Sequence, residues 1–163
     1  MKAIHVVGRQ SNGKTTLICE LLGVLRRRGL KVGTIKHSSH DHELDRPGKD
    51  SYRHRHAGAD PAGIVTAGLM AVYIPRPVDV DPLEVMEPAF RDCDLVLVEG
   101  FIGRKGLTVE VWRREVGKPL LADEWPSIIA VISDDDPPVT IPVWPRRDLE
   151  RLADEILKVV GLS

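Results

Sequence analysis

Residues 8–16 of the chain read GRQSNGKTT and contain the spacing G-x-x-x-x-G-K-T. This spacing is typical of a phosphate-binding loop when it follows a strand and opens a helix. A strand-like run at 3–7 precedes it and a helical repeat of leucines at 15–28 follows it, so both conditions are met. We therefore predict a nucleotide site formed by Gly8, Arg9, Gln10, Ser11, Asn12, Gly13, Lys14, Thr15 and Thr16.

Each residue type in this segment has a chemical use. Glycines let the backbone wrap around a phosphate, and the free amides at a helix N-terminus attract anions. Lys14 is expected to bridge the β- and γ-phosphates of a nucleoside triphosphate, and the Thr15 hydroxyl to ligate Mg²⁺. The alternative interpretation is a glycine-rich turn that carries an incidental lysine.

A triphosphate site also needs a carboxylate at a strand end to hold Mg²⁺ or its water shell. Glu99 is the first candidate, because it ends the apolar run 95–98 and precedes a glycine. Asp45 is the second, in a polar loop where Pro47 and Gly48 favour a turn. For both acids a solvated surface role stays open. The predicted metal ligands are Thr15, Glu99 and Asp45, and the predicted catalytic residues are Lys14, Glu99 and Asp45.

Strand-like and helix-like runs alternate along the chain. Strands are expected at 3–7, 31–36, 95–98, 107–112 and 128–132, a hairpin at 63–67 and 69–74, and helices at 15–28, 49–57, 83–90 and 149–160. The alternation predicts a three-layer α/β fold of the P-loop NTPase type with a mainly parallel sheet. Residues 1–163 are interpreted as a single P-loop nucleotide-binding domain, with a strand extension near 66–80 or 103–113 left open. Strand 107–112 is expected to be less buried than 95–98.

Ligands of parallel sheets bind at the carboxyl ends of the strands. The phosphate-binding loop, the loop after Lys36, Glu99 and the segment that begins at Ser133 all follow predicted strands. We therefore expect them to gather at one edge of the sheet.

Composition excludes several classes of partner. The net charge is −1 and aromatic residues are 4% of the chain, so neither a nucleic-acid surface nor a membrane surface is indicated. Cys19 and Cys93 are too few for a disulfide framework, and each lies in or beside an apolar element. We expect both to be core or near-core thiols and the chain to be cytoplasmic.

Three segments together resemble the molybdopterin-guanine dinucleotide biosynthesis protein B family. They are residues 8–16; Lys36-His37 with 45–53 and 57–59; and 95–101 with 110–113. The stretch Pro47-Gly48-Lys49-Asp50-Ser51 is the most specific part. Two positions depart from the family pattern: Ser39 stands where a histidine is expected, and Ile102 stands where a lysine is expected, so Arg104 or Lys105 would have to supply that basic contact.

The resemblance implies an accessory protein of molybdenum cofactor biosynthesis that binds GTP with Mg²⁺ and hydrolyses it slowly. Its implied partners are a guanylyltransferase that joins GMP to molybdopterin and other cofactor-handling proteins, with molybdopterin itself left open as a ligand. A homodimer is also implied. Asp134, which follows the strand at 128–132, is our choice for hydrogen bonding to guanine, with a plain polar loop as the alternative. Arg9 is expected to reach a phosphate.

Other functions of the same fold stay open. Five histidines lie between His37 and His56, which would suit a metal-delivery GTPase, although no spacing matches a standard zinc pattern. An ATP-dependent small-molecule ligase or kinase and a non-catalytic adaptor would use the same phosphate-binding loop.

Overall fold

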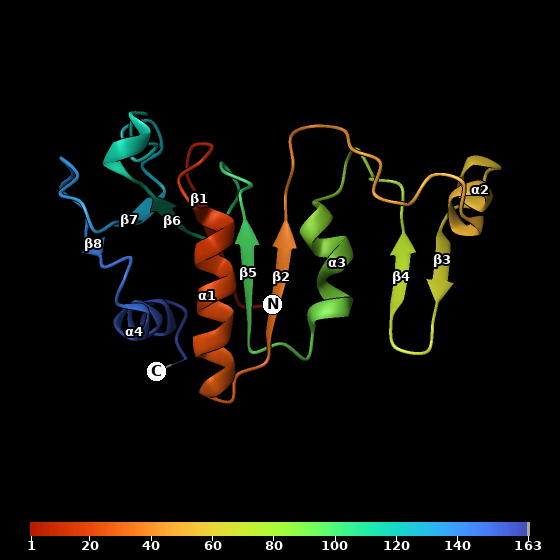
Figure 1. Ribbon diagram of the computed structural model, residues 1–163, viewed down its shortest axis with the longest axis horizontal. Helices are drawn as coiled ribbons and strands as arrows, with labels where there is room; N and C mark the ends of the chain where they lie inside the picture. Colours follow the sequence, from red (N-terminus) through yellow and green to blue (C-terminus); the bar gives the residue numbers. More distant parts are fainter. Residues whose placement is uncertain (163) are drawn as a thin grey trace. The chain divides into compact units, whose positions relative to one another are not determined.

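Six parallel strands form the sheet that positions the predicted phosphate-binding loop (Figure 1). Their order is β2-β5-β1-β6-β7-β8, and every pairing between neighbours is parallel. The strands are β1 (Ala3–Val7), β2 (Val32–Lys36), β5 (Leu95–Glu99), β6 (Leu107–Val111), β7 (Ile128–Ile132) and β8 (Val143–Trp144). The predicted α/β fold with a mainly parallel sheet is confirmed, while the short strand β8 was missed.

The computed structural model describes residues 1–162 and contains two compact units. The first holds Met1–Ser38 and the chain from Ala89 onward, and it contains the whole six-stranded sheet. The second is Ser39–Pro88. No helix within the described residues is long and apolar enough to cross a membrane.

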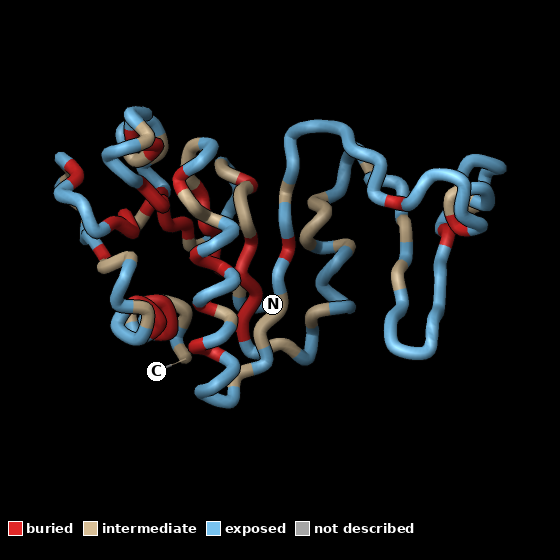
Figure 2. The backbone as a smooth tube through the Cα atoms, viewed as in Figure 1, coloured by how far each residue is buried: buried red, intermediate tan, exposed pale blue. Residues whose placement is uncertain are grey.

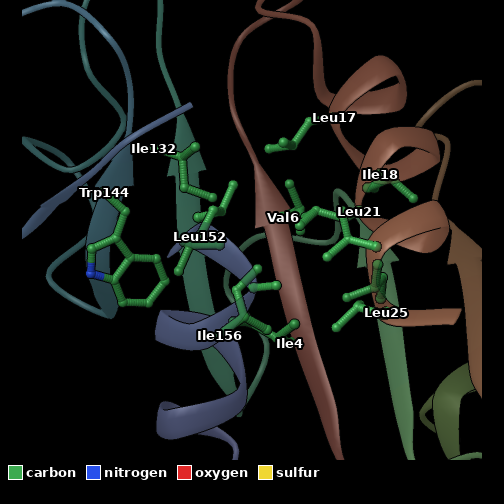
Figure 3. Packing of buried hydrophobic residues seen from close by; sticks show 14 of the residues in the cluster. Ile4, Val6, Leu17, Ile18, Leu21, Leu25, Ile132, Trp144, Leu152 and Ile156 are labelled. Atoms are coloured by element: carbon green, nitrogen blue, oxygen red, sulfur yellow. The ribbon is translucent and has the colours of Figure 1, made fainter. Parts of the chain in front are cut away.

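Two helices, α1 (Lys14–Arg27) and α4 (Leu149–Val159), cover one face of the sheet. Their apolar stripes meet the inward side chains of the strands, and Figure 3 shows Leu21 and Leu152 pointing into this core. Burying a leucine or isoleucine side chain contributes about 1.5–3 kcal/mol, so this layer supplies much of the stability of the first unit. The helical repeats expected at 15–28 and 149–160 are confirmed.

The opposite face of the sheet is covered mainly by an irregular segment. Residues on alternate positions of the strands, such as Val7 and Val131, pack against apolar side chains contributed by the segment between β6 and β7. This segment contains only the 3₁₀ turn η1 (Arg114–Val116). The helix α3 (Pro82–Phe90) ends with Phe90 close to Gly33 of β2, where a Cβ atom would lie 2.5 Å from the phenyl ring.

Strand β6 is fully integrated into the sheet, so the expectation that it would be less buried was wrong. It lies between β1 and β7, and Thr108 and Glu110 are buried despite their polarity. The Glu110 carboxylate accepts hydrogen bonds of 2.8 Å from the amides of Leu121 and Ala122. Burial raises the pKa of Glu110, while these two hydrogen bonds act in the opposite direction.

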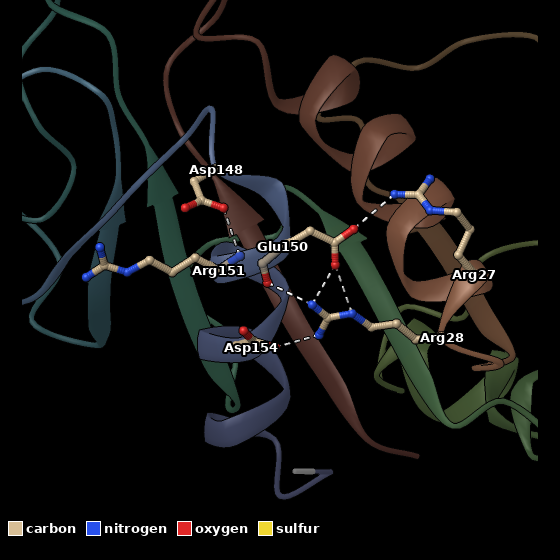
Figure 4. Close-up of polar contacts among 6 residues, drawn as sticks. All are labelled: Arg27, Arg28, Asp148, Glu150, Arg151 and Asp154. Atoms are coloured by element: carbon tan, nitrogen blue, oxygen red, sulfur yellow. Dashed lines mark hydrogen bonds and ion pairs between the residues drawn. The ribbon is translucent and has the colours of Figure 1, made fainter.

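The last turn of α1 and the first turns of α4 are joined by ion pairs (Figure 4). Arg28 contacts Glu150 at 2.7 Å and Asp154 at 2.6 Å, and Arg27 contacts Glu150 at 3.1 Å. Exposed pairs of this kind contribute little to stability individually, so the buried apolar contacts of α4 hold it in place more than these pairs do. Cys19 lies on the exposed side of α1 and Cys93 is half-buried, so the expectation of a core thiol was wrong for Cys19.

The second unit contains the helix α2 (Asp50–His56) and an antiparallel hairpin of β3 (Ala62–Val65) and β4 (Met70–Tyr73). The helix and both strands agree with the predicted positions to within a few residues. Several apolar residues of the hairpin are exposed, among them Val65, Met70 and Val72, and Figure 2 colours much of this segment as exposed.

Candidate nucleotide-binding site

The phosphate-binding loop connects β1 to the N-terminus of α1 and has the backbone shape that its glycines permit. Gly8 has φ +148°, Ser11 +72° and Gly13 +82°. A Cβ atom on Gly8 would lie 2.4 Å from the carbonyl oxygen of Val111, so β6 leaves room for no side chain there. Gly13 is the N-cap residue of α1 and offers no side chain to the free amides of the first turn, which also contains no acidic residue. The amides of this turn are thus available to an anion.

Lys14 is folded over this loop. Its ammonium donates hydrogen bonds to the carbonyl oxygens of Gly8 at 2.8 Å and Arg9 at 3.0 Å. Burial lowers the pKa of Lys14, Glu99 acts in the opposite direction, and the charge of Lys36 lowers it further. The side chain that is predicted to bind phosphates therefore lies at the mouth of the loop and close to other charged groups.

Glu99 and Thr15 come together as the strand-end rule predicts. Because β5 pairs with β1, the last residue of β5 lies beside the start of the phosphate-binding loop. The Thr15 hydroxyl is 2.9 Å from each oxygen of the Glu99 carboxylate. Asp94 lies at the other end of β5, where it accepts a hydrogen bond from the Lys31 amide.

Lys36 is a site residue that the sequence analysis did not include. It ends β2, the other neighbour of β5, and its ammonium is 2.8 Å from Glu99 Oε1. The next residue, His37, donates its amide to the Glu99 carbonyl at 2.9 Å and stacks its ring on Phe101 at 4.1 Å. The position of Lys36 at a strand end was the available signal.

A cavity of about 420 Å³ opens beside the loop and the first turn of α1. Gly13 and Thr16 line one side, and Arg113, Asp134 and Arg146 line another. The basic and acidic side chains make this cavity polar, and loop residues Asn12 and Gly13 form part of its lining.

Asp134 and Asn12 both build the wall of this cavity. Asp134 accepts the amides of Arg146 at 2.8 Å and Arg147 at 2.9 Å, so it holds the segment after β8 in place. Asn12 is completely buried and accepts the Arg113 amide at 3.2 Å. Its side-chain nitrogen has no hydrogen-bond partner among residues 1–162.

The Arg9 side chain forms an ion pair within the chain. Its guanidinium pairs with Glu124, on the segment that covers the second face of the sheet. The Nε atom of Arg9 is buried and has no partner within the described part of the chain.

Asp45 belongs to the second unit, where the residue is buried with 8% of its surface exposed. One oxygen accepts hydrogen bonds from the Arg46 amide, the Ser51 hydroxyl and the Tyr73 hydroxyl. The other oxygen is buried and has no partner in residues 1–162.

Most of the histidines predicted as an alternative metal cluster also lie in the second unit. The rings of His40 and His42 meet edge to face at 5.9 Å, and those of Tyr52 and His56 lie 4.0 Å apart, tilted by 39°. Across residues 1–162, no three His, Cys, Asp or Glu side chains are grouped so as to hold a metal ion.

A family model described as molybdopterin guanine dinucleotide synthesis protein B matches residues 3–134, which include the loop, Glu99 and Asp134. The chain belongs to this family. The resemblance inferred from the motifs is thereby confirmed.

Relatives of the MobB family match in sequence and in structure. The molybdopterin-guanine dinucleotide biosynthesis adapter protein of Escherichia coli (strain K12) is 35% identical over 153 residues, which cover 90% of this chain and 86% of the relative. A crystal structure of a MobB protein homolog from Bacillus stearothermophilus superposes with a TM-score of 0.69 at 25% identity and covers 100% of both chains. A second crystal structure, of molybdopterin-guanine biosynthesis protein B, gives a TM-score of 0.70 at 29% identity over 96% of this chain and 99% of that one.

Proposed function

We propose that the chain is a GTP-binding adapter in the formation of molybdopterin-guanine dinucleotide, assisting the guanylyltransferase that joins GMP to molybdopterin. The observation that carries this proposal is the convergence of Lys14, Thr15 and Glu99 at the open N-terminus of α1 in a chain of the MobB family. Lys14 and the loop amides would hold the β- and γ-phosphates of GTP.

The residues present fit a magnesium ion. A hydroxyl and a carboxylate are hard oxygen donors of the kind that Mg²⁺ prefers, and Thr15 and Glu99 are already in contact. The carboxylate also pairs with the ammonium of Lys36, so its negative charge is directed toward the proposed site. A bound Mg²⁺ would neutralise phosphate charge there. The sequence-based prediction that Asp45 is a further ligand is not carried into this site, because Asp45 belongs to the second unit.

The polar cavity beside Gly13 and Thr16 would take the ribose and base of the nucleotide. Asp134 lines this cavity, and its carboxylate accepts hydrogen bonds from the amides of Arg146 and Arg147. We therefore keep Asp134 as the residue that would recognise guanine. Hydrolysis would be slow, below the ~10 s⁻¹ that is common for enzymes, because Glu99 would hold the cation when GTP is bound and would not act as a general base toward a water molecule.

Calorimetric titration with GTP, GDP and ATP, each with and without Mg²⁺, tests the nucleotide part of the proposal. We expect GTP to bind more tightly than ATP and Mg²⁺ to strengthen GTP binding. Addition of the GTP-loaded protein to the purified guanylyltransferase and molybdopterin should then increase dinucleotide formation. Absence of GTP binding, or equal binding of ATP, would contradict the nucleotide assignment, and an unchanged yield would contradict the adapter role.

We also propose that the hairpin mediates a homodimer. Val65 and Met70 lie opposite each other and are 75% and 73% exposed, and Val72 on the same face as Met70 is 61% exposed. An isolated two-stranded hairpin is marginally stable in water, so a second copy of this chain covering the apolar residues would stabilise it.

The double variant Met70→Glu/Val72→Glu should convert the dimer to a monomer, because two carboxylates would be buried in the interface without partners. Sedimentation velocity at micromolar concentration measures the change. The control is Val78→Glu, at a 96% exposed position outside the hairpin, which should leave the dimer intact. A double variant that sediments like the wild type would exclude this interface.

A further inference from the structure

Lys36 and Thr15 share one oxygen of Glu99. The ammonium of Lys36 is 2.8 Å from Oε1, and the Thr15 hydroxyl is 2.9 Å from the same atom. Lys36 therefore lies within two hydrogen-bond lengths of the threonine at which the terminal phosphates and their cation would bind. The Lys36 side chain is 64% exposed and the Glu99 side chain only 12%, so the lysine reaches in from solvent over a fixed carboxylate.

The two lysines of the site are held differently. Lys14 is anchored by two carbonyl oxygens of its own loop. Lys36 is held by the Glu99 carboxylate, which in the proposed site would also bind a divalent cation. A divalent cation on Glu99 would repel the Lys36 ammonium. Lysine is a flexible point charge with three donors, so it can leave one anion for another nearby.

The backbone around Lys36 is fixed, so only its side chain has to move. β2 pairs with β5 up to Lys36 and Glu99, and the His37 amide donates to the Glu99 carbonyl at 2.9 Å. The His37 ring stacks on Phe101 with an interplanar angle of 7°. These contacts keep the Cα atom of Lys36 beside the site whichever anion its ammonium binds.

We propose that Lys36 recognises the terminal phosphate of GTP: it pairs with Glu99 when no triphosphate is bound and transfers to the γ-phosphate when GTP and a divalent cation occupy the site. Lys36 thereby distinguishes GTP from GDP, and its release from Glu99 allows that carboxylate to serve the cation. The inference rests on the proposed nucleotide function and adds to it a residue that distinguishes a triphosphate from a diphosphate.

Calorimetric titration of Lys36→Met with GTP and with GDP, both in Mg²⁺, tests the proposal. Loss of one hydrogen-bonded charge pair should weaken GTP binding about 10- to 100-fold, whereas GDP affinity should change less than about threefold. Lys36→Arg should recover part of the GTP affinity. The matched control is Lys31→Met, which removes the same charge just before β2, beside Asp94 at the other end of β5, and should leave both affinities unchanged.

Thermal unfolding without nucleotide should show all three variants folded. The proposal is overturned if Lys36→Met keeps the wild-type ratio of GTP to GDP affinity, including the case in which both affinities fall equally. A wild-type protein that binds neither nucleotide would instead overturn the nucleotide function itself, so the two failures give different results.

Discussion

Lys14→Ala is expected to raise the Kd for GTP at least about 100-fold, because hydrogen bonds to charged groups contribute about 1.5–3 kcal/mol each and Lys14 would make two, to the β- and γ-phosphates. In the structure this ammonium already lies over the phosphate-binding loop, bound to the carbonyl oxygens of Gly8 and Arg9. Isothermal titration calorimetry with GTP and Mg²⁺ measures the loss.

The substitution also removes the two hydrogen bonds to the loop carbonyls, so the stability of the variant has to be followed by thermal unfolding. Only a modest decrease is expected, since Lys14 is partly exposed and water can replace it. Lys31→Ala provides the comparison for loss of a positive charge elsewhere. If folded Lys14→Ala binds GTP within about threefold of the wild type, the proposed nucleotide site would lose its basis. A change of about threefold in Kd corresponds to less than the ~1 kcal/mol that an ordinary hydrogen bond contributes.

Gly8→Ala is expected to lower the free energy of unfolding by at least about 3 kcal/mol, because two penalties act together. The backbone has φ +148°, where L-residues with a side chain are rare, and the new Cβ atom would lie 2.4 Å from the Val111 carbonyl oxygen. That oxygen belongs to the central strand β6 and cannot move away without disturbing the sheet. Urea denaturation followed by circular dichroism measures the difference.

Gly29→Ala separates these two penalties. Gly29 follows α1 with φ +82°, and a Cβ atom there would meet nothing within 4 Å. Gly29→Ala should therefore lower the free energy of unfolding by only about 1–2 kcal/mol, the penalty of the left-handed conformation itself. Equal losses for Gly8→Ala and Gly29→Ala would mean that the approach of β6 to the loop is less close than the structure shows.

Local patterns were sufficient to predict the loop between β1 and α1 and the proximity of Thr15 and Glu99. The loop is continuous in sequence, and a strand-end carboxylate needs only the general rule that parallel strands present their carboxyl ends together. The family resemblance and the long helical repeats of α1 and α4 rest on equally local information.

Other parts of the site depend on strand order, which no local pattern contains. Lys36 meets Glu99 because β2 is the neighbour of β5, although the two residues are 63 positions apart. Arg9 meets Glu124 across 115 positions. Strand 107–112 was expected to be less buried than 95–98, but Glu110 is buried there because Leu121 and Ala122 donate their amides to its carboxylate.

The strand order also determines when the sheet around the loop can form during translation. β1 pairs on one side with Leu95–Glu99 and on the other with Leu107–Val111, so it has both neighbours only after the chain through Val111 has been synthesised. Parallel pairings of such long sequence separation form slowly. A nascent chain that has left the ribosome only as far as β2 would carry the complete G-x-x-x-x-G-K-T motif without the sheet that shapes it, and the proposed nucleotide site would form only as β5 and β6 emerge.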